Sequence, residues 1–123
     1  MADKKIIFVA FAIEDERSRD FLKGHTQLAH CPFEYIDMSV KEAYEKDWKE
    51  KVKTRIKRSD GVIALVSKNS VNSSGQKWEI DCAKEEGKNV LGIWAYTADR
   101  TILSGITTKE WTWETIGNFI DKV

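Results

Sequence analysis

The 123-residue chain has one proline, two cysteines and no excess charge of either sign. Its 20 basic and 20 acidic side chains cancel, so no net field would steer the protein toward nucleic acid or an anionic membrane. The apolar run at residues 6–13 is too short to cross a bilayer and shows no small-residue cleavage pattern. We therefore expect a cytoplasmic protein with neither nucleic acid nor a membrane as a partner.

The two cysteines, Cys31 and Cys82, do not have the C-x-x-C spacing of a metal or redox site. Isolated cysteines of this kind usually behave as small apolar residues in a reducing compartment. The sequence also has no internal repeat and no linker rich in proline and glycine. We expect no metal site and a single domain over residues 1–123, which is a usual domain length.

The chain does contain a regular alternation of apolar runs and helix-like segments. Short apolar runs predict strands at residues 6–13, 32–36, 62–66 and 89–94. The tail, residues 111–120, predicts a short fifth strand or turn and a closing amphipathic helix. Alternation on this scale predicts an α/β fold, with a parallel sheet of about five strands and helices on both faces.

Two helices are predicted in the middle of the chain. Trp48, Val52 and Ile56 recur every four residues in a segment otherwise rich in lysine and arginine, which indicates one buried helical stripe. A second helix is expected at residues 76–86. Ser73 and Gln76 resemble a capping box before it, and Gly87 occupies the place of a C-terminal glycine.

Ligands of parallel α/β sheets bind beyond the carboxyl ends of the strands. That rule selects the loops at residues 11–16, 37–46 and 67–76. The first loop is acidic and would repel a flavin phosphate, and the strand at 62–66 is not followed by the aspartate that a phospho-acceptor domain needs. No G-x-G-x-x-G run for a dinucleotide is present either.

Glu79 is a carboxylate one turn into the predicted helix 76–86, between Trp78 and Ile80. A positioned carboxylate suits cleavage at a ribosyl carbon, where it can bind ribose hydroxyls and stabilise an oxocarbenium-like transition state. The alternative is an acidic residue that interacts with the helix dipole, a contribution of about 0.3–1 kcal/mol. Spacing alone favours the dipole role.

The order of these motifs resembles that of TIR-like domains, and more narrowly the bacterial group that includes the sensor subunit of Thoeris antiphage defence. Residues 61–94 carry an apolar strand, a Ser/Asn-rich loop, the Glu79-Ile80 pair, an Ala-x-x-x-Gly-Lys exit and a Leu-Gly-Ile strand. FVAFAIED at 8–15 and Trp-Thr-Trp at 111–113 extend the resemblance over nearly the whole chain.

The resemblance implies a flavodoxin-like three-layer TIR-like fold and makes Glu79 the catalytic residue. In this family the equivalent glutamate cleaves the nicotinamide–ribose bond of NAD, which is a substrate, so no cofactor is expected. Capture of the ribosyl cation by water would give ADP-ribose, and capture by another hydroxyl of the same molecule would give a cyclic ADP-ribose isomer. Thoeris-type enzymes use the cyclic product to activate a separate effector protein, and TIR-like sites are often completed by a neighbouring copy.

The resemblance also suggests residues that contact the substrate. Phe11 is expected to stack on a base, whereas Trp48 and Trp78 would line the pocket although both also suit the core. The expected polar contacts are Asp15, Ser39, Ser67, Asn69 and Asn72.

Two departures from the family pattern keep alternatives open. The family often has a tryptophan about four residues before the catalytic glutamate, where this chain has Gly75, and Ala10-Phe11-Ala12 replaces a common Ser-Tyr. These changes favour a non-catalytic adaptor that assembles through its helices and the 37–46 loop. A nucleoside deoxyribosyltransferase-like enzyme is a third possibility, with Asp15 and Asp37 as the supporting acids.

Overall fold

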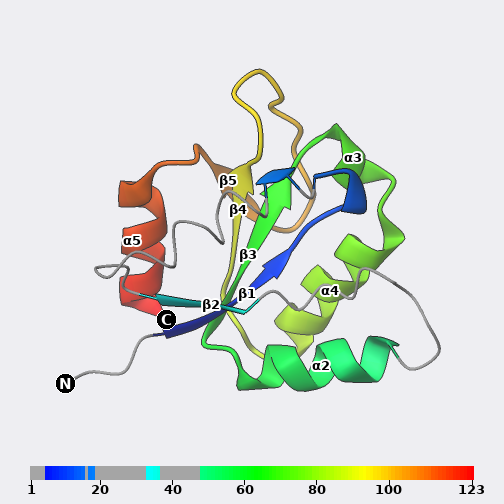
Figure 1. The fold of residues 1–123 in the computed structure, drawn as a ribbon, viewed down its shortest axis with the longest axis vertical. Helices are drawn as coiled ribbons and strands as arrows, with labels where there is room; N and C mark the ends of the chain where they lie inside the picture. Colours follow the sequence, from blue (N-terminus) through cyan, green and yellow to red (C-terminus); the bar gives the residue numbers. More distant parts are fainter. Residues whose placement is uncertain (1–4, 16, 19–32, 37–47) are drawn as a thin grey trace.

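The computed structural model describes residues 5–15, 17, 18, 33–36 and 48–123. Five parallel strands form one sheet in the order β2-β1-β3-β4-β5 (Figure 1). The strands are β1 (Lys5–Ala10), β2 (Phe33–Ile36), β3 (Gly61–Val66), β4 (Val90–Trp94) and β5 (Thr107–Lys109). This order is that of flavodoxin-like sheets, and it confirms the predicted α/β fold.

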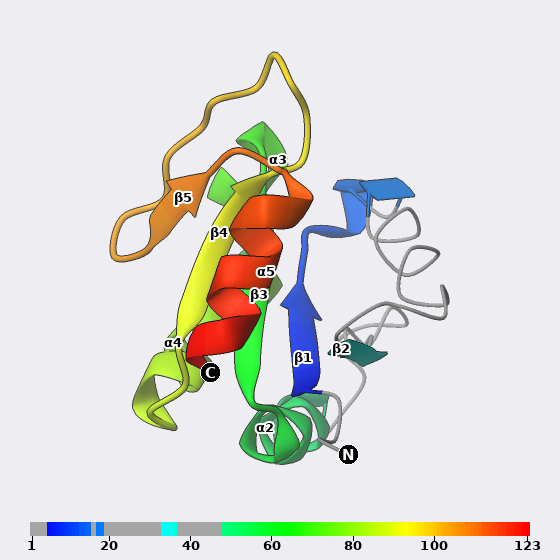
Figure 2. The ribbon, with the colours of Figure 1, turned by 90° about the vertical axis from the view of Figure 1, so that its left-hand side faces the viewer.

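Helices cover both faces of the sheet, as predicted. The helical segments are η1 (Ile13–Asp15), α2 (Trp48–Arg58), α3 (Lys68–Val71), α4 (Ser74–Glu85) and α5 (Trp113–Lys122). Of the described helices, α5 lies on one face of the sheet, whereas α2 and α4 lie on the other (Figure 1 and Figure 2). The fold is therefore three-layered, and each face of the sheet has its own buried cluster.

The two clusters follow from the alternation of side chains along the strands. Ile7 and Val9 of β1 face α5 together with Ile63, whereas Phe8 and Ala10 face the opposite cluster with α2 and α4. β3 is buried at every position, as expected of a strand at the centre of a parallel sheet. The strand order reverses between β1 and β3, so their carboxyl ends form the switch point of the sheet.

Three local predictions need correction. The fifth strand lies at Thr107–Lys109, before the Trp-Thr-Trp segment, and Trp113 already begins α5. The predicted loop 67–76 contains the one-turn helix α3, because the Ser67 hydroxyl caps it by accepting a hydrogen bond from the Asn69 N–H at 3.0 Å. The helix predicted at residues 76–86 begins two residues earlier, at Ser74, and ends at Glu85. Gly87 follows its C-terminus with a positive φ of 73°, which confirms the predicted role of this glycine.

Candidate active site at the carboxyl ends of the strands

Gln76 joins the first turn of α4 to the switch point of the sheet. Its Nε2 donates to the carbonyl oxygens of Leu65 at 2.8 Å and Ala10 at 3.1 Å, near the ends of β3 and β1. The Ser73 hydroxyl accepts from the Gln76 N–H at 3.2 Å, so the predicted cap is present. The second half of the predicted capping box is absent from this described segment, because the Gln76 side chain is hydrogen-bonded to the strand carbonyls instead.

Glu79 lies one turn further along α4 and is only 4% exposed. Desolvation by burial raises the pKa of its carboxyl to about 8. No hydrogen bond or ion pair joins this carboxyl to another residue in the described part of the chain. A buried carboxyl in this setting is neutral at pH 7 and ionises when a cation or a hydrogen-bond donor approaches it.

Asp15 is the centre of a hydrogen-bond network beside the switch point. Its carboxylate accepts from the Ser67 hydroxyl at 2.5 Å, the Asn69 side-chain amide at 2.9 Å and the Tyr96 hydroxyl at 2.8 Å. Asp15 is fully buried, and its backbone N–H donates to the Ala12 carbonyl at 2.8 Å. The network therefore fixes the loops that follow β1, β3 and β4 against one another.

The predicted substrate contacts separate into distinct environments. Asp15, Ser67 and Asn69 meet directly, as just described. Phe11 is 2% exposed and belongs to the cluster on the α5 side, so its ring has no free face for stacking on a base in this conformation. Asn72 is exposed at the end of α3.

Of the two predicted tryptophans and Ser39, the structure describes the side chain of Trp78 only. Trp78 is half-buried on α4, and the Lys49 ammonium lies 5.6 Å from its ring centroid, which links α2 to α4. Trp48 begins α2, and its side chain lies outside the described part of the structure, as do Ser39 and Asp37.

Two residues of this region were missed by sequence reasoning. Gln76 was identified only as a helix cap, although it is fully buried and its Oε1 has no hydrogen-bond partner among the described residues. Tyr96 lies two residues after the end of β4, and its hydroxyl contact with Asp15 spans 81 positions of the chain. The rule that selects loops beyond strand ends would have found Tyr96 if it had been applied to the fourth strand as well.

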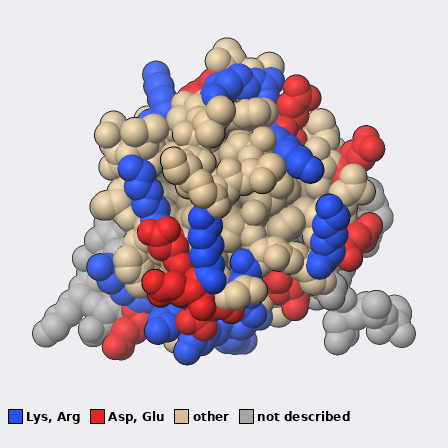
Figure 3. All heavy atoms as spheres, turned by 180° about the vertical axis from the view of Figure 1, so that it is seen from behind, with Lys and Arg blue, Asp and Glu red and all other residues tan. Residues whose placement is uncertain are grey.

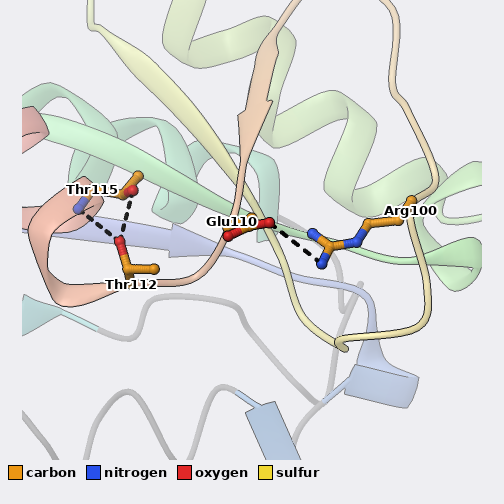
Figure 4. A network of polar contacts seen from close by, with 4 residues as sticks. All are labelled: Arg100, Glu110, Thr112 and Thr115. Atoms are coloured by element: carbon orange, nitrogen blue, oxygen red, sulfur yellow. Dashed lines mark hydrogen bonds and ion pairs between the residues drawn. The ribbon is translucent and has the colours of Figure 1, made fainter.

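A cavity of about 500 Å³ lies at the carboxyl end of β4, on another part of this edge. Trp94, Trp111 and Trp113 line it together with Arg17 and Arg100, whereas Glu79 does not. Figure 4 shows the Arg100–Glu110 ion pair beside it and the threonines that begin α5. The Glu79 carboxyl and this cavity are therefore separate features.

On the face in Figure 3, basic and acidic side chains are intermingled. Within the described ranges, no group of three or more His, Cys, Asp or Glu residues is arranged to hold a metal ion. None of the described helices combines the length and the apolar character needed to cross a membrane.

Comparison with known proteins supports the resemblance seen in the sequence. The family described as "Thoeris protein ThsB, TIR-like domain" matches residues 8–100, a range that includes β1, the Asp15 network and the whole of α4. No curated protein matches the chain. Because the matched range covers most of the sequence and the sheet has the expected order, the chain belongs to the TIR-like domain family of the Thoeris antiphage-defence protein ThsB.

Proposed function

We propose that this protein cleaves NAD at the nicotinamide–ribose bond, with Glu79 as the catalytic carboxylate. The observation that carries the proposal is the burial of Glu79, which raises its pKa to about 8 without an ion-pair partner in the described part of the chain. Such a carboxyl is costly to keep in a core, and perturbed carboxyls of this kind concentrate at functional sites. Family membership favours the same residue.

The chemistry proposed for Glu79 depends on the charge of the substrate. The nicotinamide ring of NAD is cationic, so its approach would favour loss of the Glu79 proton. The resulting carboxylate would bind a ribose hydroxyl and stabilise the cation that forms as the C1′–N bond breaks and its electron pair leaves with neutral nicotinamide. The Gln76 Oε1, a buried acceptor one turn earlier on α4, is a further candidate to bind a ribose hydroxyl.

The fate of the ribosyl cation determines the product. Attack by water, with loss of its proton, gives ADP-ribose. Attack by another hydroxyl of the same molecule gives a cyclic ADP-ribose isomer, which we propose as the product. In this proposal the isomer is a cytoplasmic signal of bacterial antiphage defence that activates a separate effector protein.

Access to Glu79 is part of the proposal. A residue that is 4% exposed cannot receive a substrate unless neighbouring segments move or the site is completed by another copy of the chain. We propose that copies assemble on activation and open the site, so the isolated protein would have low basal activity.

A non-catalytic adaptor is the second candidate, and the same burial of Glu79 favours it. A deoxyribosyltransferase-like enzyme gains less support, because the Asp15 carboxylate is already engaged by three donors.

The test compares wild type with Glu79→Gln and with Glu85→Gln, an exposed glutamate of the same helix. Each purified protein is incubated with NAD, with and without lysate from phage-infected cells, and products are resolved by liquid chromatography and mass spectrometry. We expect nicotinamide and a product with the mass of cyclic ADP-ribose from wild type and Glu85→Gln, and neither from Glu79→Gln. Absence of NAD consumption in all three, with unchanged assembly, would favour the adaptor.

A further inference from the structure

The cavity at the carboxyl end of β4 has the size and lining of a small-molecule site. Its volume of about 500 Å³ lies within the usual range for ligand pockets. Trp94 at the end of β4, Trp111 two residues before α5 and Trp113 at the start of α5 provide aromatic walls. This position differs from that of Glu79, which lies on α4 and does not line the cavity.

Arg100 supplies a cation that is held in place at the wall of the cavity. Its guanidinium carbon lies 4.6 Å from the centroid of the Trp94 ring. The Trp94 Nε1 donates to the Thr101 carbonyl oxygen at 2.8 Å, which fixes the ring that supports the guanidinium. A planar cation oriented in this way suits bidentate binding of a phosphate or carboxylate.

The existing ion pair of Arg100 leaves that capacity largely unused. Its Nη2 lies 3.8 Å from Oε1 of Glu110, and the two side chains are 44% and 69% exposed (Figure 4). Long, exposed pairs of this kind contribute little. An anionic ligand can therefore replace Glu110 as the partner of Arg100, and the Arg17 side chain, which also lines the cavity, adds a second positive charge.

The first turn of α5 places one aromatic side chain, Trp113, at the cavity. Thr112 caps the helix, and its Oγ1 accepts from the Thr115 N–H at 3.0 Å. Trp113, the first residue of α5, is 40% exposed, so part of a large aromatic ring faces solvent at the cavity. Aromatic faces beside cations recognise ligands that combine a planar ring with an anionic group.

We propose that this cavity binds a nucleotide, with the base against Trp111 and Trp113 and the phosphate at Arg100 and Arg17. The site is separate from Glu79, and the proposal does not depend on NAD cleavage.

The first test is a calorimetric titration of the full chain with AMP, adenosine and inorganic phosphate. Because the proposed site contacts both the base and the phosphate, AMP should bind saturably and at least about tenfold more tightly than adenosine or phosphate. Absence of saturable AMP binding at millimolar concentration would overturn the proposal. If adenosine binds as tightly as AMP, the arginines do not contribute to binding. If phosphate binds as tightly as AMP, the cavity binds anions alone. Either result also overturns the proposal.

Variants locate the site. Arg100→Gln and Trp113→Ala should each weaken AMP at least about fivefold. Glu110→Gln should strengthen it by up to about fivefold, because Arg100 loses its competing partner and the phosphate loses a repelling neighbour. A gain of affinity cannot result from misfolding, and thermal unfolding of each variant controls for damage to the fold.

Two controls separate this site from the proposed catalytic one. Glu79→Gln and Arg58→Gln, the latter an exposed arginine at the end of α2, should bind AMP like wild type. Loss of AMP binding in Glu79→Gln with retention in Arg100→Gln would place the nucleotide at Glu79 and overturn the proposal. Neither result depends on whether NAD is cleaved.

Discussion

The Glu79 carboxyl is buried where its ionised form is disfavoured, and this has a consequence for stability. Its pKa is about 8 in the folded chain against about 4.5 when exposed, so the folded state holds the proton more tightly. The stabilisation of the folded state by this bound proton is complete below about pH 4.5 and is lost as the pH rises through about 8. The Glu79 contribution to the free energy of unfolding therefore falls with pH across this window.

Glu79→Gln should remove that pH dependence, because an amide does not ionise. At pH 7 we expect the variant to be more stable than wild type by roughly 1–3 kcal/mol, which is the reverse of the usual effect of a core substitution. Urea unfolding of both proteins at several pH values measures this difference. If the free energies of unfolding of wild type and variant change with pH in the same way, the assigned pKa of Glu79 is wrong.

Asp15 has the opposite character, since its carboxylate is matched to three donors. Asp15→Asn would place an amide N–H₂ against one of these donors and leave it unsatisfied in the core. We expect a loss of about 2–4 kcal/mol in the free energy of unfolding. Asp81→Asn, at an exposed position of α4, is the matched control and should change stability little. Equal effects of the two substitutions would show that the network does not stabilise the fold.

At the scale of elements, two glycines test how α5 packs on the sheet. A Cβ at Gly61, the first residue of β3, would lie 2.9 Å from Cγ1 of Val123 and 3.1 Å from Cζ of Phe119. Gly61→Ala must therefore displace these two side chains at the end of α5, and we expect a destabilisation of about 1–3 kcal/mol.

Gly117 provides the contrast within α5, because a Cβ there meets no atom within 4 Å. Gly117→Ala should stabilise the protein by about 0.5–1 kcal/mol through the better helix propensity of alanine. Thermal unfolding of the two variants measures both effects. The packing account fails if Gly61→Ala is as stable as Gly117→Ala.

At the scale of the whole molecule, the sequence predicted the architecture well. Apolar runs such as residues 62–66 can only be buried on both faces, which required a parallel sheet covered by helices on each side. The fifth strand was misplaced because Thr107–Lys109 is short and polar and is defined by its pairing with β4.

The candidate site was predicted only in part, for reasons of long-range geometry. Ser67 and Asn69 were identified from their loop, but their shared contact with Asp15 spans more than 50 positions. The burial of Phe11 follows from strict alternation, because Ile7, Val9 and Phe11 face the same cluster. Counting that alternation beyond the end of β1 would have placed Phe11 in the core. The hydrogen bonds of Gln76 to two strands could not be inferred from local sequence.

The measurement that tests the central claim most directly is the pH dependence of the basal kcat/KM for NAD in the resting protein, in which Glu79 is buried. This quantity reports the ionisation of essential groups in the free enzyme. If the Glu79 carboxylate is the catalytic group, kcat/KM should rise about tenfold per pH unit below about pH 8 and level off above it. A profile that stays flat from about pH 6 to about pH 9 would contradict the account, because no buried carboxyl with a raised pKa would then limit the reaction.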